Sequence, residues 1–565
     1  MSTKKRHNEV VFKPYIQNQG WLFPPSLGDL IPQDHKVRLV NDAIDGMNID
    51  TILSTYKGGG TSSYHPKMLL KVLVYGYIEK IYSSRGIEKA LQENVCFMWL
   101  SGMQQPDHNT LNTFRRHRLN QTVKQVFAQV LLLLIEQGYV RMKDYHVDGT
   151  KMESVANRYT FVWAKNVERY KNSLLDKIAL LIAQIEQTNE KEEALAKQVS
   201  GPQEEVLHSH EDKITDSEAL QKTIVRINEE LNNSSESEKV LKKKRTKVKK
   251  LAEQHLEKLR DYERQELLLN GRSSYSKTDT DATFMRTKED HLGTGQLKPC
   301  YNIQLGTEDQ FIVNYTVHQT ASDMSSFITH MDDTIELLNQ IEASLPENAV
   351  ADAGYGSEKN YEYLAAKGIE AYVKYPGFYK ERKGKFKYPF DMRTLYYNEQ
   401  EDYFVCPMGQ HMHRIKDFKK KTSKGKEQTI TQYGGTNCSN CPLRTRCFKK
   451  KGNRIIEVNH KSRAYRKSAR QRLETLKGLR KRKKRNVDTE PVFGHIKYNR
   501  GFRRFMLTTS QGVCIETGLL AIAHNFTKWH LQGQCRRRSL PSPKHPMAQI
   551  MQLPTIQANY LIKTG

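Results

Sequence analysis

Two stretches far apart in the sequence share one pattern: apolar, β-prone residues end in an aspartate, and glycine follows. They read YHVDG at 145–149 and VADAG at 350–354, and they bring forward Asp148 and Asp352. Such runs predict strands, and glycine there permits a sharp turn or the close approach of another group. The residues from 301 to 315 predict a hairpin with its loop at 306–310, and helices are expected at 325–342 and from 357. Strand, hairpin, helix, strand, helix is the order of an α/β domain, with acids at two strand ends. For either acid alone, a simple turn former is the more common explanation.

A third acid lies in the stretch DTEPVFGHIKYNRGFRRF at 488–505. We expect a helix that begins here, because Asp488 is a suitable N-cap and Pro491 suits the first turn. Glu490 and Lys497 are seven residues apart and share one helix face, where they could hold a metal ion beside a phosphate. A surface helix with one solvated glutamate explains this stretch equally well. Cations interleaved with aromatic residues follow, namely Arg500, Arg503 and Arg504.

The charge of the chain indicates its partner. Its 565 residues include 90 Lys and Arg against 63 Asp and Glu, which gives a net charge of +27. This excess favours a polyanion, either nucleic acid or an anionic membrane surface. The longest apolar run, VLLLLI at 130–135, is far shorter than the about 18–20 residues of a membrane span, and the N-terminus has no secretory signal. We therefore expect nucleic acid as partner, no membrane, and a cytoplasmic protein.

The segment from 66 to 139 has a helical pattern and carries Arg115 and Arg116 in the run TFRRHRL. Several short helices with an Arg-rich member predict a DNA-binding domain of the helix-turn-helix kind. A plain helical bundle with a solvated basic face is the alternative.

Between 166 and 270 the composition shifts to Glu, Lys, Gln and Leu. Leucine and isoleucine recur at spacings of three and four, as in Leu174, Ile178, Leu181 and Ile185. This pattern predicts a coiled-coil hairpin or a three-helix arm inserted into the α/β domain. Such an arm could serve dimerisation or reach along DNA, or be a solvated spacer.

The stretch 375–480 is basic and contains half of the eight cysteines. We expect it to be irregular. Few cysteines in a long chain favour a reducing compartment over disulfides. The CxxC pair with two further cysteines predicts a structural zinc site, and reduced, unliganded thiols are the alternative. The four candidate ligands are Cys406, Cys438, Cys441 and Cys447.

The three acids together suit phosphodiester chemistry. Two Mg²⁺ ions about 4 Å apart can activate the attacking oxygen and stabilise the leaving one, and hard cations prefer carboxylate oxygens. Asp279, Asp281, Glu289 and Asp290 are not expected to be ligands, because they precede the hairpin and are predicted to lie in a solvated loop.

The chain resembles the DDE transposases of bacterial insertion sequences, closest to the insertion-sequence-1182 group. Long blocks in one order carry this resemblance: YHPKMLLKVLVYGY, PDHNTLNTFRRHRL, VDGTKMESVANRYTFVW, VADAGYGSEKNYEYL, CSNCPLRTRC and EPVFGHIKYNRGFRRFMLTTSQGVCIETGLLAIAHN. The resemblance implies an RNase H-like catalytic core whose metal triad is Asp148, Asp352 and Glu490. Lys497 fits the lysine of a Tyr, Arg, Glu, Lys signature. Lys483 and Asn486 stand where Tyr and Arg are expected, so this chain departs from the signature there.

The implied activity is cleavage and joining of double-stranded DNA. The enzyme would bind the terminal inverted repeats of its element, cut the 3′ strand ends with Mg²⁺ or Mn²⁺, and transfer them to target DNA, as at least a homodimer at the bacterial nucleoid. Arg115, Arg116, Lys497, Arg500, Arg503 and Arg504 would contact DNA. An inactive, architectural DNA-binding protein and a nuclease that never joins strands are the alternatives.

The predicted domain boundaries follow from these patterns. They are an N-terminal segment (1–60), a helical DNA-binding domain (61–140), the first parts of the catalytic core (141–165 and 271–374), the arm (166–270), the Cys-rich insertion (375–480), the C-terminal helices of the core (481–532) and a flexible tail (533–565).

Overall fold

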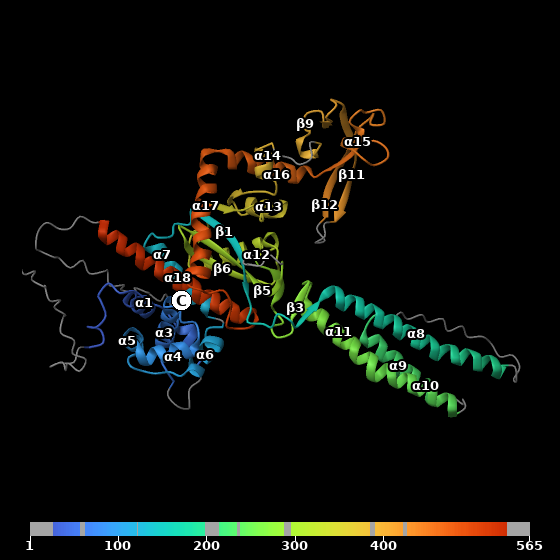
Figure 1. The fold of residues 1–565 in the computed structure, drawn as a ribbon, viewed down its shortest axis with the longest axis horizontal. Coiled ribbons are helices and arrows are strands. Elements are labelled where there is room, and N and C mark those ends of the chain that lie inside the picture. Colours follow the sequence, from blue (N-terminus) through green and yellow to red (C-terminus); the bar gives the residue numbers. More distant parts are fainter. Residues whose placement is uncertain are drawn as a thin grey trace, which may run out of the picture. The chain divides into compact units, whose positions relative to one another are not determined.

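The computed structural model divides into two compact units, residues 1–114 with 530–565 and residues 115–529. We describe each unit by itself (Figure 1). The structure describes residues 26–56, 63–120, 122–197, 214–233, 238–287, 295–384, 390–421 and 427–539. The sequence WLFPP at 21–25 predicts an anchoring apolar segment, and GGG at 58–60 predicts a flexible joint. Both lie outside the described residues.

The first unit is helical, as the sequence predicts. Its helices are α1 (Lys36–Asp45), α2 (Asp50–Leu53), α3 (Pro66–Ile78), α4 (Ser84–Glu93), α5 (Val95–Ser101) and α6 (His108–Thr113). Helix α3 is buried along almost its whole length. It starts with Pro66 in the first turn, where a missing N–H costs nothing, and the His65 side chain accepts a hydrogen bond from the Lys67 N–H. A helix that is apolar on every side belongs in the middle of a bundle.

A mixed sheet forms the centre of the second unit (Figure 1). Strand β1 (Asp144–Glu153) pairs antiparallel with β5 (Leu297–Glu308) and parallel with β7 (Asn348–Ala351). On the far side of β5 lie β4 (Thr283–Arg286) and β6 (Phe311–His318), and β8 (Glu370–Val373) extends the sheet beyond β7 in parallel. The helices of this unit include α7 (Val123–Glu136), α12 (Asp323–Gln340), α13 (Glu358–Ala366) and α17 (Leu476–Gly494). The α/β class is therefore confirmed.

The hairpin between β5 and β6 is tighter than the sequence suggested. The predicted loop of 306–310 is wrong, because pairing continues to Glu308 against Phe311. Asp309 and Gln310 alone make the turn, with φ of +49° and +64°. Two left-handed residues match the twist of the paired strands, and so the loop needs no further residues.

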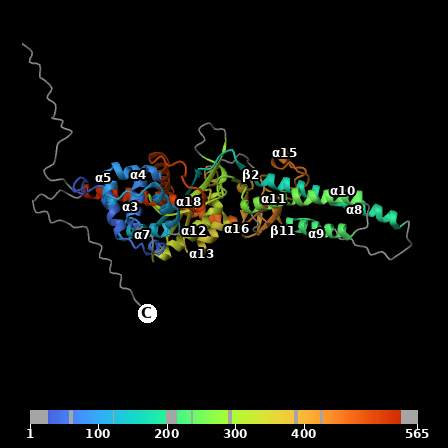
Figure 2. The same ribbon diagram turned by 90° about the horizontal axis from the view of Figure 1, so that it is seen from below.

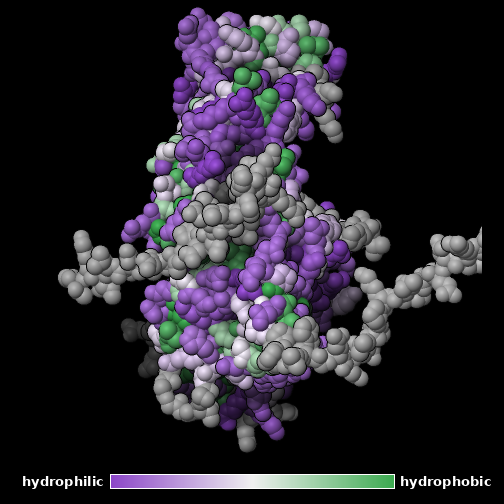
Figure 3. All heavy atoms as spheres, turned by 90° about the vertical axis from the view of Figure 1, so that its left-hand side faces the viewer, coloured by the Kyte–Doolittle hydropathy of each residue, from purple (hydrophilic) through white to green (hydrophobic). Residues whose placement is uncertain are grey.

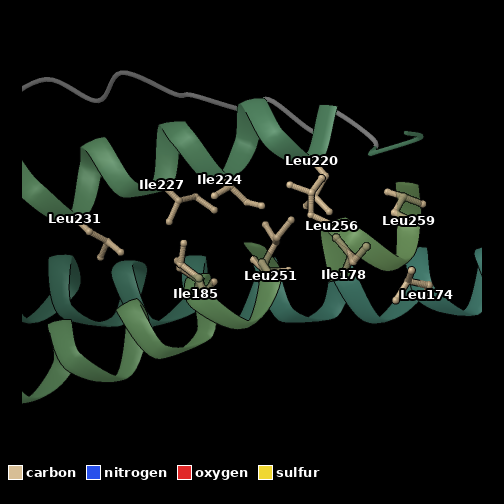
Figure 4. Packing of buried hydrophobic residues seen from close by; sticks show 12 residues of the cluster. Leu174, Ile178, Ile185, Leu220, Ile224, Ile227, Leu231, Leu251, Leu256 and Leu259 are labelled. Atoms are coloured by element: carbon tan, nitrogen blue, oxygen red, sulfur yellow. The ribbon is translucent and has the colours of Figure 1, made fainter. Parts of the chain in front are cut away.

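The arm between β2 (Phe161–Trp163) and β3 (Ser274–Ser276) is helical. It contains α8 (Ala164–Lys197), α9 (Ser217–Asn233), α10 (Glu238–Lys250), a π-helical turn (Leu251–His255) and α11 (Leu256–Leu269). These helices lie side by side in both ribbon views (Figure 2). Leucine and isoleucine side chains from α8, α9 and the α10–α11 segment point toward one another and form a continuous apolar core (Figure 4). Gly201 and Pro202, at which the sequence predicts a break between helices, lie outside the described residues.

The Cys-rich insertion is a small β-domain, so the expectation of an irregular segment is wrong. Five antiparallel strands run in the order β13 (Ile455–Val458), β12 (Glu427–Gly434), β11 (His411–Lys421), β10 (Tyr403–Val405) and β9 (Tyr396–Asn398). Their alternating residues bury a core that includes Phe404, Met412 and Tyr433. In the sequence, the short helix α14 (Phe378–Arg382) precedes these strands and α15 (Arg444–Cys447) lies between β12 and β13, and α16 (His460–Glu474) leads back to the main sheet. The many exposed lysines of β11 had masked this alternation.

Two helix predictions near the C-terminus need correction. The helix expected to begin at Asp488 begins at Leu476, with the Thr475 side chain as its cap, and Pro491 lies inside it. Asp488 is buried and accepts hydrogen bonds from the Thr307 hydroxyl (2.6 Å) and the Gln310 N–H (3.1 Å). Helix α18 runs from Thr509 to Ser539. The start of the predicted loose tail is therefore helical, and residues 540–565 lie outside the described part.

One face of the molecule is largely polar. On the face drawn in Figure 3, hydrophilic residues cover most of the described area, and hydrophobic ones form small scattered patches.

Candidate active site at the edge of the central sheet

Asp148 and Asp352 lie next to each other where the parallel pairing of β1 and β7 ends. The last paired residues are Val147 and Ala351, and each aspartate follows its partner directly. Asp148 is not at the end of its strand, because β1 continues to Glu153 in its antiparallel pairing with β5. The edge of the sheet therefore presents two neighbouring carboxylates.

Gly149 serves close approach rather than a turn. A Cβ atom at this position would lie 2.2 Å from Gln304 Nε2 and 2.9 Å from Asp323 Oδ1. Gln304 Nε2 donates to Asp323 Oδ1 (3.0 Å), and the Tyr355 hydroxyl donates to Gln304 Oε1. Any side chain at position 149 would displace this network.

Tyr355 lies close enough to these acids to be affected by their charges. Burial raises the pKa of Tyr355 well above its ordinary value, and the charges of Asp323, Asp148 and Asp352 raise it further. The phenol therefore stays protonated and keeps donating to Gln304. A buried network with every partner in place holds the strand edge rigid.

Helix α17 places a cation between the two aspartates. Arg485 Nη2 lies 2.9 Å from Asp148 Oδ2 and 3.8 Å from Asp352 Oδ2. The Arg485 side chain is 7% exposed, against 15% for Asp148 and 43% for Asp352. Thr489, one turn later, has its hydroxyl 3.5 Å from Asp148 Oδ2. The buried face of α17 thus lies against the acidic edge.

Glu490 follows Thr489 on α17, and its side chain is exposed. Among the residues that the structure describes, no three His, Cys, Asp or Glu side chains form a group arranged to hold a metal ion. The structure thus brings Asp148 and Asp352 together, and it leaves Glu490 in the neighbouring turn of the facing helix without joining it to them.

Two stretches of the chain match known protein families. Residues 25–117 match the family described as Transposase domain (DUF772), and residues 405–530 match the family described as Transposase DDE domain. The chain carries two transposase domains. This agrees with a DDE transposase of the insertion-sequence-1182 type. No curated protein and no solved structure matches the chain.

Only part of the candidate site lies within a matched range. The DDE match contains Glu490 and Arg485, whereas Asp148 and Asp352 precede it. The first match covers helices α1 to α6 and extends to Arg115 and Arg116. In the part of the chain that the structure describes, no helix is both long and apolar enough to span a bilayer.

The cations predicted to contact DNA divide into buried and exposed ones. Arg115 is buried beside the Glu516 carboxylate (3.9 Å), and Lys497 is buried with its ammonium donating to the Lys151 carbonyl (3.1 Å). Arg500 is also buried and donates to the Thr527 hydroxyl (2.5 Å). These three cations face the protein interior, so the structure argues against them as contacts for a DNA surface.

The other three cations are exposed. Arg116 and Arg503 face solvent, and the Arg503 guanidinium lies 5.5 Å from the centre of the Tyr498 ring. Arg504 donates to the backbone carbonyls of Ser154 (3.0 Å) and Val155 (2.6 Å). Arg504 therefore ties its own segment to the residues that follow β1, while Arg116 and Arg503 remain accessible.

The four cysteines of the insertion line one small cavity. Backbone N–H groups of Met408 and Arg454 donate to the sulfur atoms of Cys406 and Cys438, each at 3.4 Å. The Arg454 guanidinium donates to Cys447 Sγ at 3.0 Å. Thiols that gather N–H donors around a common space have the donor chemistry of a thiolate site, although they do not form a closed ligand group in this structure.

Sequence reasoning missed Arg485 and misplaced Asp279. Arg485 was hidden inside a run of cations, and only a helix extended upstream of Asp488 places Arg485 and Thr489 one turn apart on one face. Asp279 is buried rather than solvated, and it accepts hydrogen bonds from the Ser154 hydroxyl (2.6 Å) and the Tyr301 hydroxyl (2.9 Å). Glu289 and Asp290 lie outside the described residues.

Proposed function

We propose that this protein is a DNA transposase that binds the ends of its own insertion element, cleaves them in a metal-dependent reaction and transfers the new 3′ ends into target DNA. The observation that carries the proposal is the pairing of Asp148 with Asp352 at the end of the parallel β1–β7 ladder, in a chain with transposase domains. Two adjacent carboxylates at a strand edge can bind divalent cations next to a phosphodiester.

The strand order supports an RNase H-like core. Three antiparallel strands (β6, β5, β1) are followed by two that are parallel to β1 (β7, β8). In this arrangement Asp148 follows the part of β1 that pairs with β7, and Asp352 follows β7. A helix from later in the sequence covers the same edge, and α17 lies there, in contact with β1 and β7.

The residues present fit divalent metal ions. The two aspartates offer carboxylate oxygens and already attract a cation, the Arg485 guanidinium. Asp148, Asp352 and Glu490 would hold Mg²⁺ or Mn²⁺, which when bound supplies activation of the attacking oxygen and stabilisation of the leaving one. Glu490 must turn toward the aspartates to join them. Its exposure leaves it free to do so.

The protein's own groups would orient the DNA. Arg116 and Arg503 are accessible for phosphate contacts, and the net charge of +27 favours DNA in general. Two element ends must be joined in one event, so we propose at least a homodimer in the active complex, acting in the bacterial cytoplasm.

The test is a strand-transfer assay with a labelled, pre-cut element end, target duplex and Mg²⁺. We expect joined product from the wild type and a loss of at least about 100-fold for Asp148→Asn and Glu490→Gln, since each removes a metal-binding charge. Glu474→Gln, which changes an exposed acid that pairs with Arg470 (3.0 Å), is the control and keeps full activity. Equal product from Glu490→Gln and wild type would remove Glu490 from the triad. Tight end binding without product from any protein would favour the inactive, architectural DNA-binding protein.

We also propose a structural Zn²⁺ held by Cys406, Cys438, Cys441 and Cys447, supported by their shared cavity and the N–H donors around it. The ion would stabilise the small β-domain and take no part in strand transfer. Metal analysis of the purified protein is expected to find one zinc per chain that is lost in Cys438→Ser. Zinc-free wild-type protein of full stability would contradict this.

A further inference from the structure

We propose that Arg485 is a resident counter-ion of the two-aspartate site, which divalent metal must displace before the site can work. The inference rests on the proposed metal-binding role of Asp148 and Asp352 and adds a residue that sets the affinity of that site. It starts from the way in which the oxygens of the two carboxylates are used.

Each carboxylate has one oxygen fixed by the backbone and one that faces the guanidinium. Asp148 Oδ1 accepts from the Gly149 N–H (2.9 Å), and Asp352 Oδ1 accepts from the Gly354 N–H (2.7 Å). The two Oδ2 atoms face a single nitrogen, Arg485 Nη2, at 2.9 and 3.8 Å. The guanidinium therefore occupies the carboxylate oxygens that would be available to a divalent cation.

The guanidinium is held by charge more than by a full set of hydrogen bonds. The Arg485 side chain is 7% exposed, and its Nε is buried with no hydrogen-bond partner among the described residues. A buried cation with an unsatisfied donor is less firmly fixed than a bidentate Arg–carboxylate pair. Arg485 can therefore neutralise the acids in the metal-free protein and still be displaced from them.

Metal and guanidinium compete for the same two oxygens. Mg²⁺ and Mn²⁺ need carboxylate oxygens at about 2.1 Å, and a cationic nitrogen at hydrogen-bond distance from those oxygens opposes a second cation by charge and by volume. Removal of Arg485 should therefore tighten metal binding, whereas removal of a residue that merely positions Asp148 would weaken it or leave it unchanged. The two roles predict opposite signs.

The same helix offers a matched control. Arg482 lies one turn before Arg485 and is buried to a similar extent, since the two residues are 7% and 6% exposed. The Arg482 guanidinium, however, lies 5.3 Å from the centre of the Phe378 ring rather than against the two aspartates. Arg482→Gln removes a buried cation from α17 without touching Asp148 or Asp352. Its effect separates general damage to the helix from loss of the counter-ion.

The experiment titrates Mn²⁺ into the full-length protein without DNA and measures free Mn²⁺ by electron paramagnetic resonance. We expect Arg485→Gln to bind Mn²⁺ about tenfold more tightly than wild type, in the range of typical coupling between competing sites. Arg482→Gln should bind Mn²⁺ as wild type does. The rise in melting temperature on adding Mn²⁺ should be larger for Arg485→Gln than for wild type.

Each other outcome has a definite meaning. Equal or weaker Mn²⁺ binding by Arg485→Gln overturns the inference, and so does a gain of the same size in Arg482→Gln. If Asp148→Asn binds Mn²⁺ as well as wild type does, the metal site of the proposed function is itself wrong, which is a separate failure. Should Arg485→Gln fail to fold without metal, Arg485→Lys carries the test. Its shorter, single-point cation should compete less and give tighter binding than wild type, and unchanged affinity would overturn the inference.

Discussion

Two helices of this chain carry almost the same run of cations and use it in opposite ways. Helix α10 contains KKKR at 242–245, and α17 contains RKRKKR at 480–485. In α10 three of the four cations are exposed, whereas α17 buries Lys481, Arg482 and Arg485. The difference lies in the facing elements. Strand β1 offers Asp144 to Lys481 and Asp148 to Arg485, while α10 packs on an apolar arm core.

The comparison teaches that a basic run does not by itself mark a DNA-binding surface. The free energy cost of burying a cation is small only where a carboxylate or the face of an aromatic ring lies next to it. The partners of α17 come from strands more than a hundred residues away, and no local pattern announces them. The measurements below test this contrast, beginning with the largest expected effect.

Breaking a buried pair on α17 should be costly. The Lys481 ammonium contacts the Asp144 carboxylate, with side chains 8% and 17% exposed. Lys481→Ala leaves Asp144 without this partner, and we expect the free energy of unfolding to fall by about 3 kcal/mol in chemical denaturation. Lys483→Ala, an exposed cation on the same helix, should stay within about 0.5 kcal/mol of wild type. Equal effects from both would remove the distinction between buried and exposed cations.

The buried histidine His524 gives a second test, through the pH dependence of stability. Burial lowers the pKa of His524 to about 3 from its ordinary 6.5, so this imidazole is neutral in the folded protein. As the pH falls below about 6.5, the unfolded chain takes up a proton that the folded one does not. The contribution of His524 to the free energy of unfolding is therefore fully present above pH 6.5. Between pH 6.5 and about 3 the free energy of unfolding falls by about 1.4 kcal/mol per pH unit.

Denaturation of His524→Gln between pH 7 and 5 checks this. The slope of stability against pH should decrease by the equivalent of one proton. His411→Gln, which changes an exposed histidine stacked on Tyr403, should keep the wild-type slope. An unchanged slope in His524→Gln would mean that His524 is protonated in the folded state.

The exposed cations of α10 should matter little for stability and more for DNA. The triple variant Lys242, Lys243 and Arg245→Gln should unfold within about 0.5 kcal/mol of wild type. Its affinity for a non-specific duplex should depend less on salt. The slope of log affinity against log salt concentration should change by about 0.9 for each DNA phosphate that loses its protein cation.

The arm also offers a control for charge. Lys222, Arg226 and Arg264 each have a carboxylate within reach, at 2.9, 3.7 and 3.3 Å. Their triple substitution by Gln should change the salt dependence less than the α10 variant does. If both variants bind DNA as wild type does, the arm has no part in non-specific DNA binding.

Much of the fold followed from local pattern. Apolar runs predicted β1 and β7, helical periodicity predicted the arm and the first unit, and the acids after the two runs predicted that Asp148 and Asp352 would meet. These features depend on a few neighbouring residues whose spacing matches a strand or a helix.

What could not be predicted depends on distant partners. Thr475 caps α17 thirteen residues before the expected cap. Asp488 can be buried because Thr307 and Gln310 donate hydrogen bonds to its carboxylate. The insertion looked irregular because lysines cover one of its strands. In each case the deciding contact joins segments that the sequence keeps far apart, so local propensity pointed elsewhere.

The base of the arm has a consequence for how such proteins can change over generations. Strands β2 and β3 pair Trp163 with Ser274, so the chain leaves and re-enters the domain at neighbouring positions. A segment with adjacent ends can be lengthened, exchanged or deleted as one cassette without re-threading the rest of the chain. Lineages can therefore vary everything between these two residues while the sheet that holds Asp148 and Asp352 is inherited unchanged.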